Sequence, residues 1–219
     1  MTQAVLQEER PSLAERAYLV LRDRLVTLDI RPGTPINDEH LAASLGVGRT
    51  PIREALKRLE TERLVVAYPR RGTFATEVNI TDLSHISEVR QHLEPAAAAG
   101  AARRATASDR AALGGLLDAL HRKSGEHGDS GELMRLDMSV HRAIYAATHN
   151  PYLEETLVRY DNLATRIWCL FLDRLPDLAG HVGEHSPLLQ AIVGGEPDKA
   201  AQLSADHVAH FEQAIRAAI

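Results

Sequence analysis

The segment at residues 48–59, with the sequence GRTPIREALKRL, restricts the fold of this chain more than any other. Thr50 can accept a hydrogen bond from a free backbone N–H at a helix start, and Pro51 suits the first helical position because it lacks an N–H group. We therefore expect a helix that begins here, with Arg53 and Lys57 on one side. Apolar residues recur at helical spacing on the opposite side, at Ile52, Ala55, Leu56 and Leu59. One face can pack against a core while the other carries positive charge.

The segments around this helix predict a larger motif. A shorter apolar pattern at residues 36–47 precedes it and closes at Gly46, a residue suited to a positive backbone angle. Downstream, residues 64–67 and 73–76 are rich in apolar and β-branched types and flank a turn at residues 68–72. Two helices joined by a tight turn and followed by a β-hairpin form a winged helix-turn-helix. An earlier amphipathic helix is predicted from Ala17, Tyr18, Val20, Leu21, Leu25, Val26 and Leu28.

Basic residues are concentrated at this motif. From residue 49 to residue 72 the chain has seven Lys or Arg and three Asp or Glu, whereas the whole chain has a net charge of −5. Arg49 and Arg53 are expected at base edges or phosphates, because a guanidinium can bind guanine O6 and N7 together. The predicted DNA-contacting residues are Arg49, Thr50, Arg53, Lys57, Arg70, Arg71 and Gly72, with the wing reaching along or into the minor groove. The alternative is a solvated surface helix without a nucleic-acid role.

The chain is long enough for two domains with cores of their own, at 219 residues and 44% apolar content. We place the boundary between residues 77 and 78, because the strand pattern stops there and Thr81 can cap a new helix. Residues 1–77 are then a DNA-binding domain and residues 78–219 an all-helical bundle for effector binding and dimerisation. The predicted helices of the bundle are 82–105, 108–122, 130–148, 151–174, 184–194 and 197–217. The expected fold class is therefore mostly α, with a small β-hairpin wing.

Cysteine content and hydropathy bear on the compartment. Cys169 is the single cysteine, so no internal disulfide can form, and its apolar neighbours favour a buried, unreactive thiol. The sequence shows neither a long apolar segment nor a signal peptide. We expect a cytoplasmic protein that does not contact a membrane.

Several histidines of the second domain can form a metal site. Asp137 and His141 are four residues apart on a predicted helix and share one face, so both can point inward. His185 and His207 lie on later helices and can complete a set of four ligands. Such ligands suit zinc, nickel, iron, manganese or cobalt. In the alternative interpretation, Asp137 and His141 form a simple hydrogen-bonded pair, and the other histidines, His181 and His210 among them, are solvated or partly buried.

The whole pattern resembles the GntR superfamily of bacterial transcription regulators, specifically the FadR subfamily with an FCD-type effector domain. The N-terminal resemblance is carried by residues 41–42, 45–47, 49–56, 58–59, 64–65 and 69–72, and that of the second domain by residues 90–97, 137–141, 150–153, 184–185 and 206–207. This resemblance implies a homodimer that binds an inverted-repeat operator in double-stranded DNA, usually as a repressor. It also implies a divalent metal held by Asp137, His141, His185 and His207, and a small carboxylate effector beside it.

Further expectations follow from the resemblance. Arg90 matches a basic residue that faces the effector pocket and can pair with a carboxylate, although a surface salt bridge with Glu94 is the alternative. The sequence departs from the family at Gly48, Glu39 and Arg63, where Ser or Thr, a basic residue and Gly are respectively usual. A metal-dependent hydrolase is the competing function, but no unassigned acid is placed as a general base, and such an enzyme would not need an Arg-rich winged module. We therefore expect no enzymatic activity.

Overall fold

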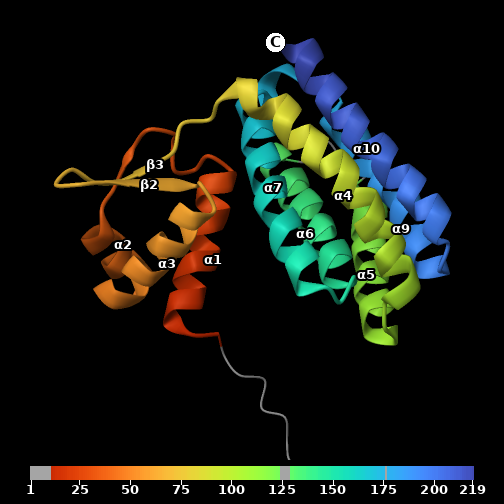
Figure 1. Ribbon diagram of the computed structural model, residues 1–219, viewed down its shortest axis with the longest axis horizontal. Coiled ribbons are helices and arrows are strands. Elements are labelled where there is room, and N and C mark those ends of the chain that lie inside the picture. Colours follow the sequence, from red (N-terminus) through yellow and green to blue (C-terminus); the bar gives the residue numbers. More distant parts are fainter. Residues whose placement is uncertain (1–10, 124–128, 176) are drawn as a thin grey trace, which may run out of the picture. The chain divides into compact units, whose positions relative to one another are not determined.

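The computed structural model describes residues 11–123, 129–175 and 177–219, and the chain divides into two compact units at Glu77 and Val78. The first unit contains three helices, α1 (Leu13–Val26), α2 (Asp38–Leu45) and α3 (Arg49–Thr61), and a small antiparallel sheet (Figure 1). Its strands are β1 (Pro35–Ile36), β2 (Val65–Tyr68) and β3 (Gly72–Ala75), in the order β1-β3-β2. The apolar side of α3 packs against α1, and the core includes Tyr18, Leu21, Leu25, Ile52 and Leu59.

The start of α3 differs from the prediction. The helix begins at Arg49 after Gly48, which is extended and provides no side-chain cap, so Thr50 and Pro51 are the second and third helical residues. The assignment of Thr50 as the cap was therefore wrong. Pro51 is nevertheless compatible with this position, because the first four N–H groups of a helix have no intrahelical partner. The α2–α3 turn follows the expected pattern, with Gly46 in the left-handed region at φ 63°.

The wing contains the predicted hairpin and one additional strand. Strand β3 pairs with β2 from Val65↔Ala75 to Tyr68↔Gly72, and with β1 on its other side. Strand β1 was not predicted because its two residues are too few to show an alternating pattern. In the hairpin turn the Arg71 N–H donates to the Tyr68 carbonyl, and Arg70 and Gly72 have φ of 62° and 90°.

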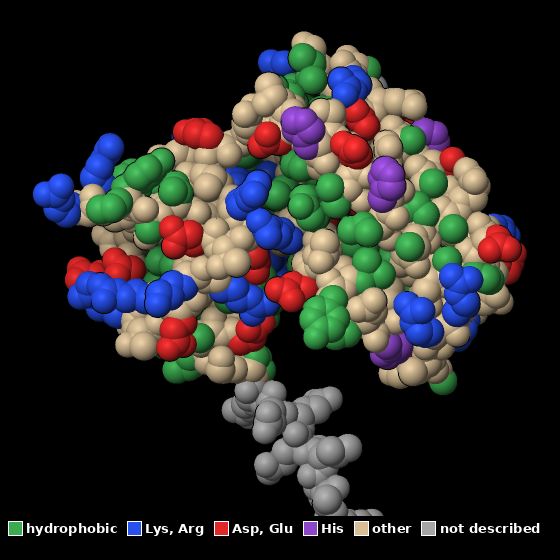
Figure 2. All heavy atoms as spheres, in the orientation of Figure 1, with side chains coloured by type: hydrophobic (Ala, Val, Ile, Leu, Met, Phe, Trp, Pro, Cys, Tyr) green, Lys and Arg blue, Asp and Glu red, His purple; other side chains and the backbone are tan. Residues whose placement is uncertain are grey.

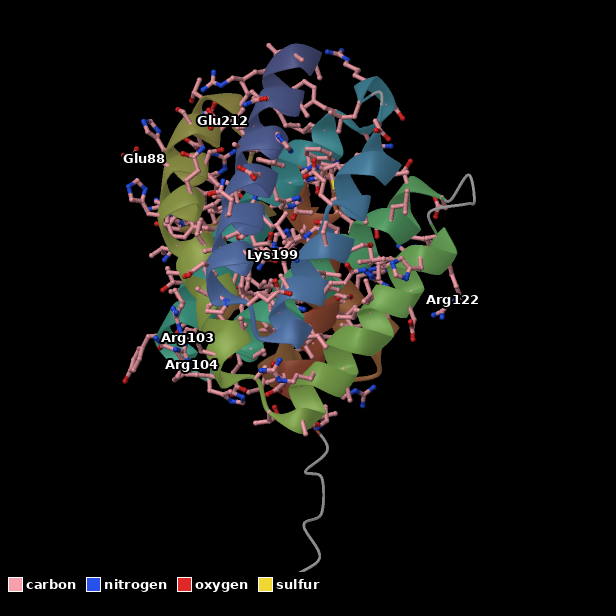
Figure 3. All side chains as sticks on the ribbon, turned by 90° about the vertical axis from the view of Figure 1, so that its right-hand side faces the viewer. Glu88, Arg103, Arg104, Arg122, Lys199 and Glu212 are labelled. Atoms are coloured by element: carbon pink, nitrogen blue, oxygen red, sulfur yellow. The ribbon has the colours of Figure 1, made fainter. Side chains whose placement is uncertain are left out.

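The second unit is a helical bundle, which confirms the predicted fold class. Its long helices are α4 (Leu83–Arg104), α5 (Ala107–Lys123), α6 (Ser130–Ala146), α7 (Pro151–Leu170), α9 (His185–Gly194) and α10 (Pro197–Ala218). Helices α4 and α10 pack along much of their length, and in Figure 3 they run side by side, with Glu88 and Glu212 labelled on the two helices. A continuous core of Leu, Ile and Ala side chains fills the bundle, with the aromatic rings of Tyr145 and Trp168.

The connections of the bundle correct three sequence-based details. Asn79, and not Thr81, provides the cap, because its side chain accepts from the Thr81 N–H at the start of the 3-10 helix η1 (Ile80–Asp82). Helix α7 ends at Leu170, followed by the 3-10 helix η2 (Leu172–Arg174). A six-residue helix, α8 (Leu178–Gly183), was not predicted.

Some expectations about single residues can also be checked. Cys169 was predicted to be a buried, unreactive thiol, and the structure shows it only partly buried. Part of the connection between the helices predicted at 108–122 and 130–148 lies outside the described residues. Among the helices that the structure describes, none is long and apolar enough to cross a bilayer.

Candidate metal centre and DNA-binding surface

Four predicted ligands meet inside the helical bundle. Asp137 and His141 lie on α6, His185 is the first residue of α9, and His207 lies on α10. One ligand atom from each lies within 4.8 Å of the others, and all four residues are buried. The structure thus brings together residues that are far apart in the sequence. His185 starts its helix, which places its side chain at the junction of α8 and α9.

The rings of the three histidines are oriented by partners at Nδ1. The His185 Nδ1–H donates to the Val182 carbonyl at 3.1 Å, and the His207 Nδ1–H donates to Glu184 Oε2 at 2.9 Å. His141 Nδ1 lies 3.0 Å from the Tyr145 hydroxyl. The Nε2 atoms of His141 and His185 approach each other to 3.3 Å. Two ligands of a tetrahedral zinc ion, each about 2.0–2.1 Å from the metal, have about this separation.

Burial controls the protonation of these groups. It lowers the pKa of His141 and His207 well below the usual range and that of His185 to about 4, so the imidazoles are neutral and can act as ligands at neutral pH. Burial, together with the nearby Asp161 carboxylate, raises the pKa of Asp137 well above its ordinary value. Asp137 Oδ1 is buried and has no hydrogen-bond partner among the described residues. The donor set and this unsatisfied oxygen fit a divalent cation.

A second group of charges lies beside the four ligands. The Arg90 Nε donates to Glu94 Oε1 at 2.5 Å, and Arg90 Nη2 lies 3.6 Å from Asp161 Oδ1. All three side chains are almost fully buried, so the salt bridge between Arg90 and Glu94, which was the alternative role for Arg90, forms in the interior and not at the surface. Glu94, on the turn after Arg90, faces the same interior because α4 is covered by α7 and α10.

The cluster borders a small cavity. Its walls are formed by Arg90, Met134, Asp137, His141, Asp161, Thr165, Trp168, His181, His207 and Phe211. Sequence analysis gave no site role to Asp161, His181 or Glu184. His181, on the unpredicted helix α8, stacks on His207 with ring centroids 4.3 Å apart and on Trp168 at 4.4 Å. With eleven histidines in the chain, nothing in the sequence distinguished His181 from the others. Only the Glu-His pair at residues 184–185 could have drawn attention to Glu184.

The exposed side of α3 carries the predicted DNA-contacting residues. Arg49, Arg53 and Lys57 are all exposed, and Arg53 and Lys57 line a groove between α3 and the sheet. Figure 2 shows Lys and Arg side chains among acidic ones on the face of this unit that is turned to the viewer. Two of these acids lie on α2 and pair with arginines of α3. Arg49 Nη1 lies 2.9 Å from Glu39 Oε1, and Arg53 Nε lies 3.3 Å from Asp38 Oδ2.

The wing places further cations at the end of the hairpin. Arg70 and Arg71 are exposed in the turn between β2 and β3, next to Gly72. The Arg71 guanidinium lies 5.8 Å from the centre of the Tyr68 ring, and Tyr68 contacts Phe74 edge to face. The wing thus presents two arginines on a short, aromatic-supported hairpin.

Comparisons with known proteins agree with this arrangement. Residues 13–75 match the gntR family of bacterial regulatory proteins, and residues 85–210 match the FCD domain. The Nta operon transcriptional regulator of Aminobacter aminovorans is 31% identical over 87% of this chain and 89% of its own length. The galactonate operon transcriptional repressor of Escherichia coli is 28% identical over 92% of this chain and 96% of its own length.

Solved structures share the fold. Escherichia coli McbR/YncC superposes with a TM-score of 0.81 at 24% identity, covering 95% of this chain and 99% of the other. A putative GntR regulator from Rhodococcus superposes with a TM-score of 0.72 at 22% identity, covering 95% and 100%. The Aminobacter and galactonate operon relatives are named as transcriptional regulators, and neither supports the alternative of a metal-dependent hydrolase. The chain belongs to the GntR family of DNA-binding transcriptional regulators and carries an FCD effector domain.

Proposed function

We propose that this regulator is a repressor that binds an inverted-repeat operator as a homodimer and responds to a small carboxylate effector. The observation that carries the proposal is the meeting of Asp137, His141, His185 and His207 in one buried cluster beside a cavity. The naming of the Escherichia coli relative as a transcriptional repressor supports repression. We place residues 1–77 as the DNA-binding domain and residues 78–219 as the domain for effector binding and dimerisation.

In the proposed metal site, three imidazoles and one carboxylate hold a divalent cation, zinc and nickel among the candidates. The bound cation would supply positive charge for an effector carboxylate. Arg90 is the cationic side chain in the cavity wall, and Glu94 and Asp161 compete with the effector for its guanidinium. The effector carboxylate therefore has to bind N–H groups of Arg90 that Glu94 and Asp161 leave available, or to replace one of these acids in a bidentate pair.

In the proposed DNA complex, α3 enters the major groove and the wing contacts the adjacent backbone. Arg49 and Arg53 contact base edges or phosphates, while Thr50, Lys57, Arg70, Arg71 and Gly72 lie along phosphates. Effector binding would change the relative population of two arrangements of the dimer, and only one of them fits half-sites about one DNA turn apart. This requires the effector to have different affinities for the two arrangements.

The DNA-binding half is tested with operator fragments from the regulator's own promoter. Arg53→Ala is expected to weaken specific binding by about 1–3 kcal/mol and to relax base preference at one position. Arg24→Ala, an exposed arginine on α1, is the matched control and should bind as the wild type does. Unchanged operator affinity in Arg53→Ala would remove α3 from the interface.

The metal-binding half is tested by elemental analysis of the purified full chain. His185→Ala should lose the metal that the wild type retains, because one of four ligands is missing. His92→Ala, an exposed histidine on α4, should keep it. Equal metal content in wild type and His185→Ala would refute the site. Thermal-shift screening with small organic acids then identifies an effector, because a ligand that binds only the folded state raises its stability.

A further inference from the structure

Glu184 connects two helices that carry proposed metal ligands. It lies at the corner between α8 and α9, directly before His185, and its side chain reaches α10. There its two oxygens accept hydrogen bonds from two imidazoles one turn apart. The His207 Nδ1–H donates to Oε2 at 2.9 Å, and the His210 Nδ1–H donates to Oε1 at 2.8 Å. One carboxylate therefore joins a buried ring to an exposed one, since the side chain of His207 is 2% exposed and that of His210 is 54% exposed.

This contact determines which nitrogen of His207 can bind a metal. With the proton held at Nδ1 by a carboxylate acceptor, the lone pair lies on Nε2. The face of the ring is also fixed, because His181 stacks on it with an interplanar angle of 21°. Rotation of the His207 ring is thus opposed by both the hydrogen bond and the stack.

The nearest partner of His207 differs chemically from those of the other two rings, although Glu94 Oε2 lies 3.5 Å from His141 Nδ1, behind the nearer Tyr145 hydroxyl. His185 donates to a backbone carbonyl, and Tyr145 meets His141 with a hydroxyl, whereas Glu184 places a carboxylate at hydrogen-bond distance. A carboxylate behind a ligating imidazole increases the basicity of the ligand and holds its orientation, and loss of such a partner commonly weakens metal binding by 10–100-fold.

We propose that Glu184 is a positioning residue of the metal centre, forming a carboxylate–histidine–metal triad through His207. His210 occupies the second carboxylate oxygen and holds Glu184 from the solvent side. This inference depends on the proposed metal site. Glu184 and His210 therefore have unequal roles. Removal of Glu184 deprives His207 of its partner, whereas removal of His210 leaves the hydrogen bond from His207 to Oε2 in place.

The test measures the dissociation constant for Zn²⁺ by chelator competition, using the full chain. Glu184→Gln retains the size of the side chain but removes its charge, and should bind Zn²⁺ about 10–100-fold more weakly. Glu184→Asp retains the charge on a shorter arm and should recover part of this loss. His210→Ala should stay within about threefold of the wild type, because the contact with His207 remains.

A second readout separates positioning from a merely structural role. The absorption spectrum of bound Co²⁺ reports the geometry and strength of coordination. Glu184→Gln, which frees the His207 ring and lowers its basicity, should change the spectrum, while His210→Ala should not. The thermal midpoint of each metal-free variant is measured alongside, because a structural role would lower this midpoint and leave the Zn²⁺ affinity and Co²⁺ spectrum unchanged.

Three outcomes would overturn the inference. Wild-type affinity for Zn²⁺ in Glu184→Gln would show that His207 needs no carboxylate. An equal loss in His210→Ala would show that the triad is not the relevant unit. Absence of Zn²⁺ binding by the wild type itself would remove the proposed metal site as well, so failure of the site and failure of the triad give different results.

Discussion

Two ion pairs, one beside the DNA-binding surface and one beside the candidate metal centre, differ in their exposure to solvent. In the first unit Arg53 pairs with Asp38, and the two side chains are 65% and 32% exposed. In the second unit Arg90 and Glu94 are each 3% exposed. An exposed pair contributes at most about 1 kcal/mol and is screened by salt, so its arginine can exchange an acid for a phosphate. A buried charge that loses its partner is strongly destabilising. The charged groups on the exposed face of α3 are therefore exchangeable, whereas those of the Arg90 cluster are fixed.

The largest effect is expected at Arg90. Arg90→Met removes the cation but leaves Glu94 and Asp161 buried, and should lower the free energy of unfolding of the second unit by about 3–5 kcal/mol. Denaturant unfolding followed by the fluorescence of Trp168, the single tryptophan of the chain, reports on this unit. Arg103→Met, at an exposed position of α4 (Figure 3), should change it by less than about 0.5 kcal/mol. An equally small effect of Arg90→Met would show that the buried Arg90 is as dispensable for stability as an exposed arginine.

A somewhat smaller effect is expected from the metal. Zn²⁺ at 100 times its dissociation constant should stabilise the second unit by about 2.7 kcal/mol, because it binds the folded state preferentially. The same Trp168 fluorescence measures this gain, and His185→Ala should abolish it. If Zn²⁺ stabilised His185→Ala as much as the wild type, the four-residue cluster would not be the binding site.

On the DNA-binding surface, the expected change is a modest gain. Glu39→Gln removes the acid that holds Arg49 and should tighten DNA binding by up to about fivefold, the equivalent of about 1 kcal/mol for an exposed pair. The dependence of affinity on salt should become steeper, because Arg49 keeps only the more distant acid, Asp38 at 3.8 Å, and can exchange it for a phosphate more readily. Fluorescence anisotropy over a salt series measures both quantities. Asp29→Asn, at an exposed acid of the same unit, is the control. A gain in affinity of the same size in this variant would show that the effect comes from net charge and not from the contact between Glu39 and Arg49.

The smallest effect is expected at the end of α3. Arg63 has φ 64°, and its N–H and that of Leu64 donate to the carbonyls of Glu60 and Leu59, as in a Schellman motif. Arg63→Gly should raise the free energy of unfolding of the first unit by about 0.5–1 kcal/mol, because Gly adopts this conformation without the Cβ clash. Arg63→Ala keeps the Cβ and should give no gain in thermal unfolding followed by circular dichroism. Equal stability of the two variants would show that the left-handed angle carries no strain.

Prediction from sequence succeeded where the signal was local. The apolar spacing of Ile52, Ala55, Leu56 and Leu59 identified a helix with one buried face, and these four residues are buried in the structure. Predictions of helix ends were less accurate, since Thr50 lies inside α3 and Thr81 inside η1. A side-chain cap depends on a single hydrogen bond. Asn79 was as available for it in the sequence as Thr81, and α3 begins at Gly48 without any side-chain cap.

The candidate site depended on more than spacing. The spacing of Asp137 and His141 placed both on one helical face, but the choice of His185 and His207 among eleven histidines required the family resemblance. The short helix α8, which carries His181, and the buried acid Asp161 had no periodic signal that marked them.

The sequence by itself determined the long helices, the hairpin and the cationic face of α3, because these depend on propensities and periodicities within a few turns. Only the tertiary structure decided that Arg90 and Glu94 are buried, that Glu184 reaches two histidines of α10, and that Asp38 and Glu39 hold the arginines of α3. Burial and partner choice depend on which helices pack against one another. That packing is a property of residues far apart in the chain.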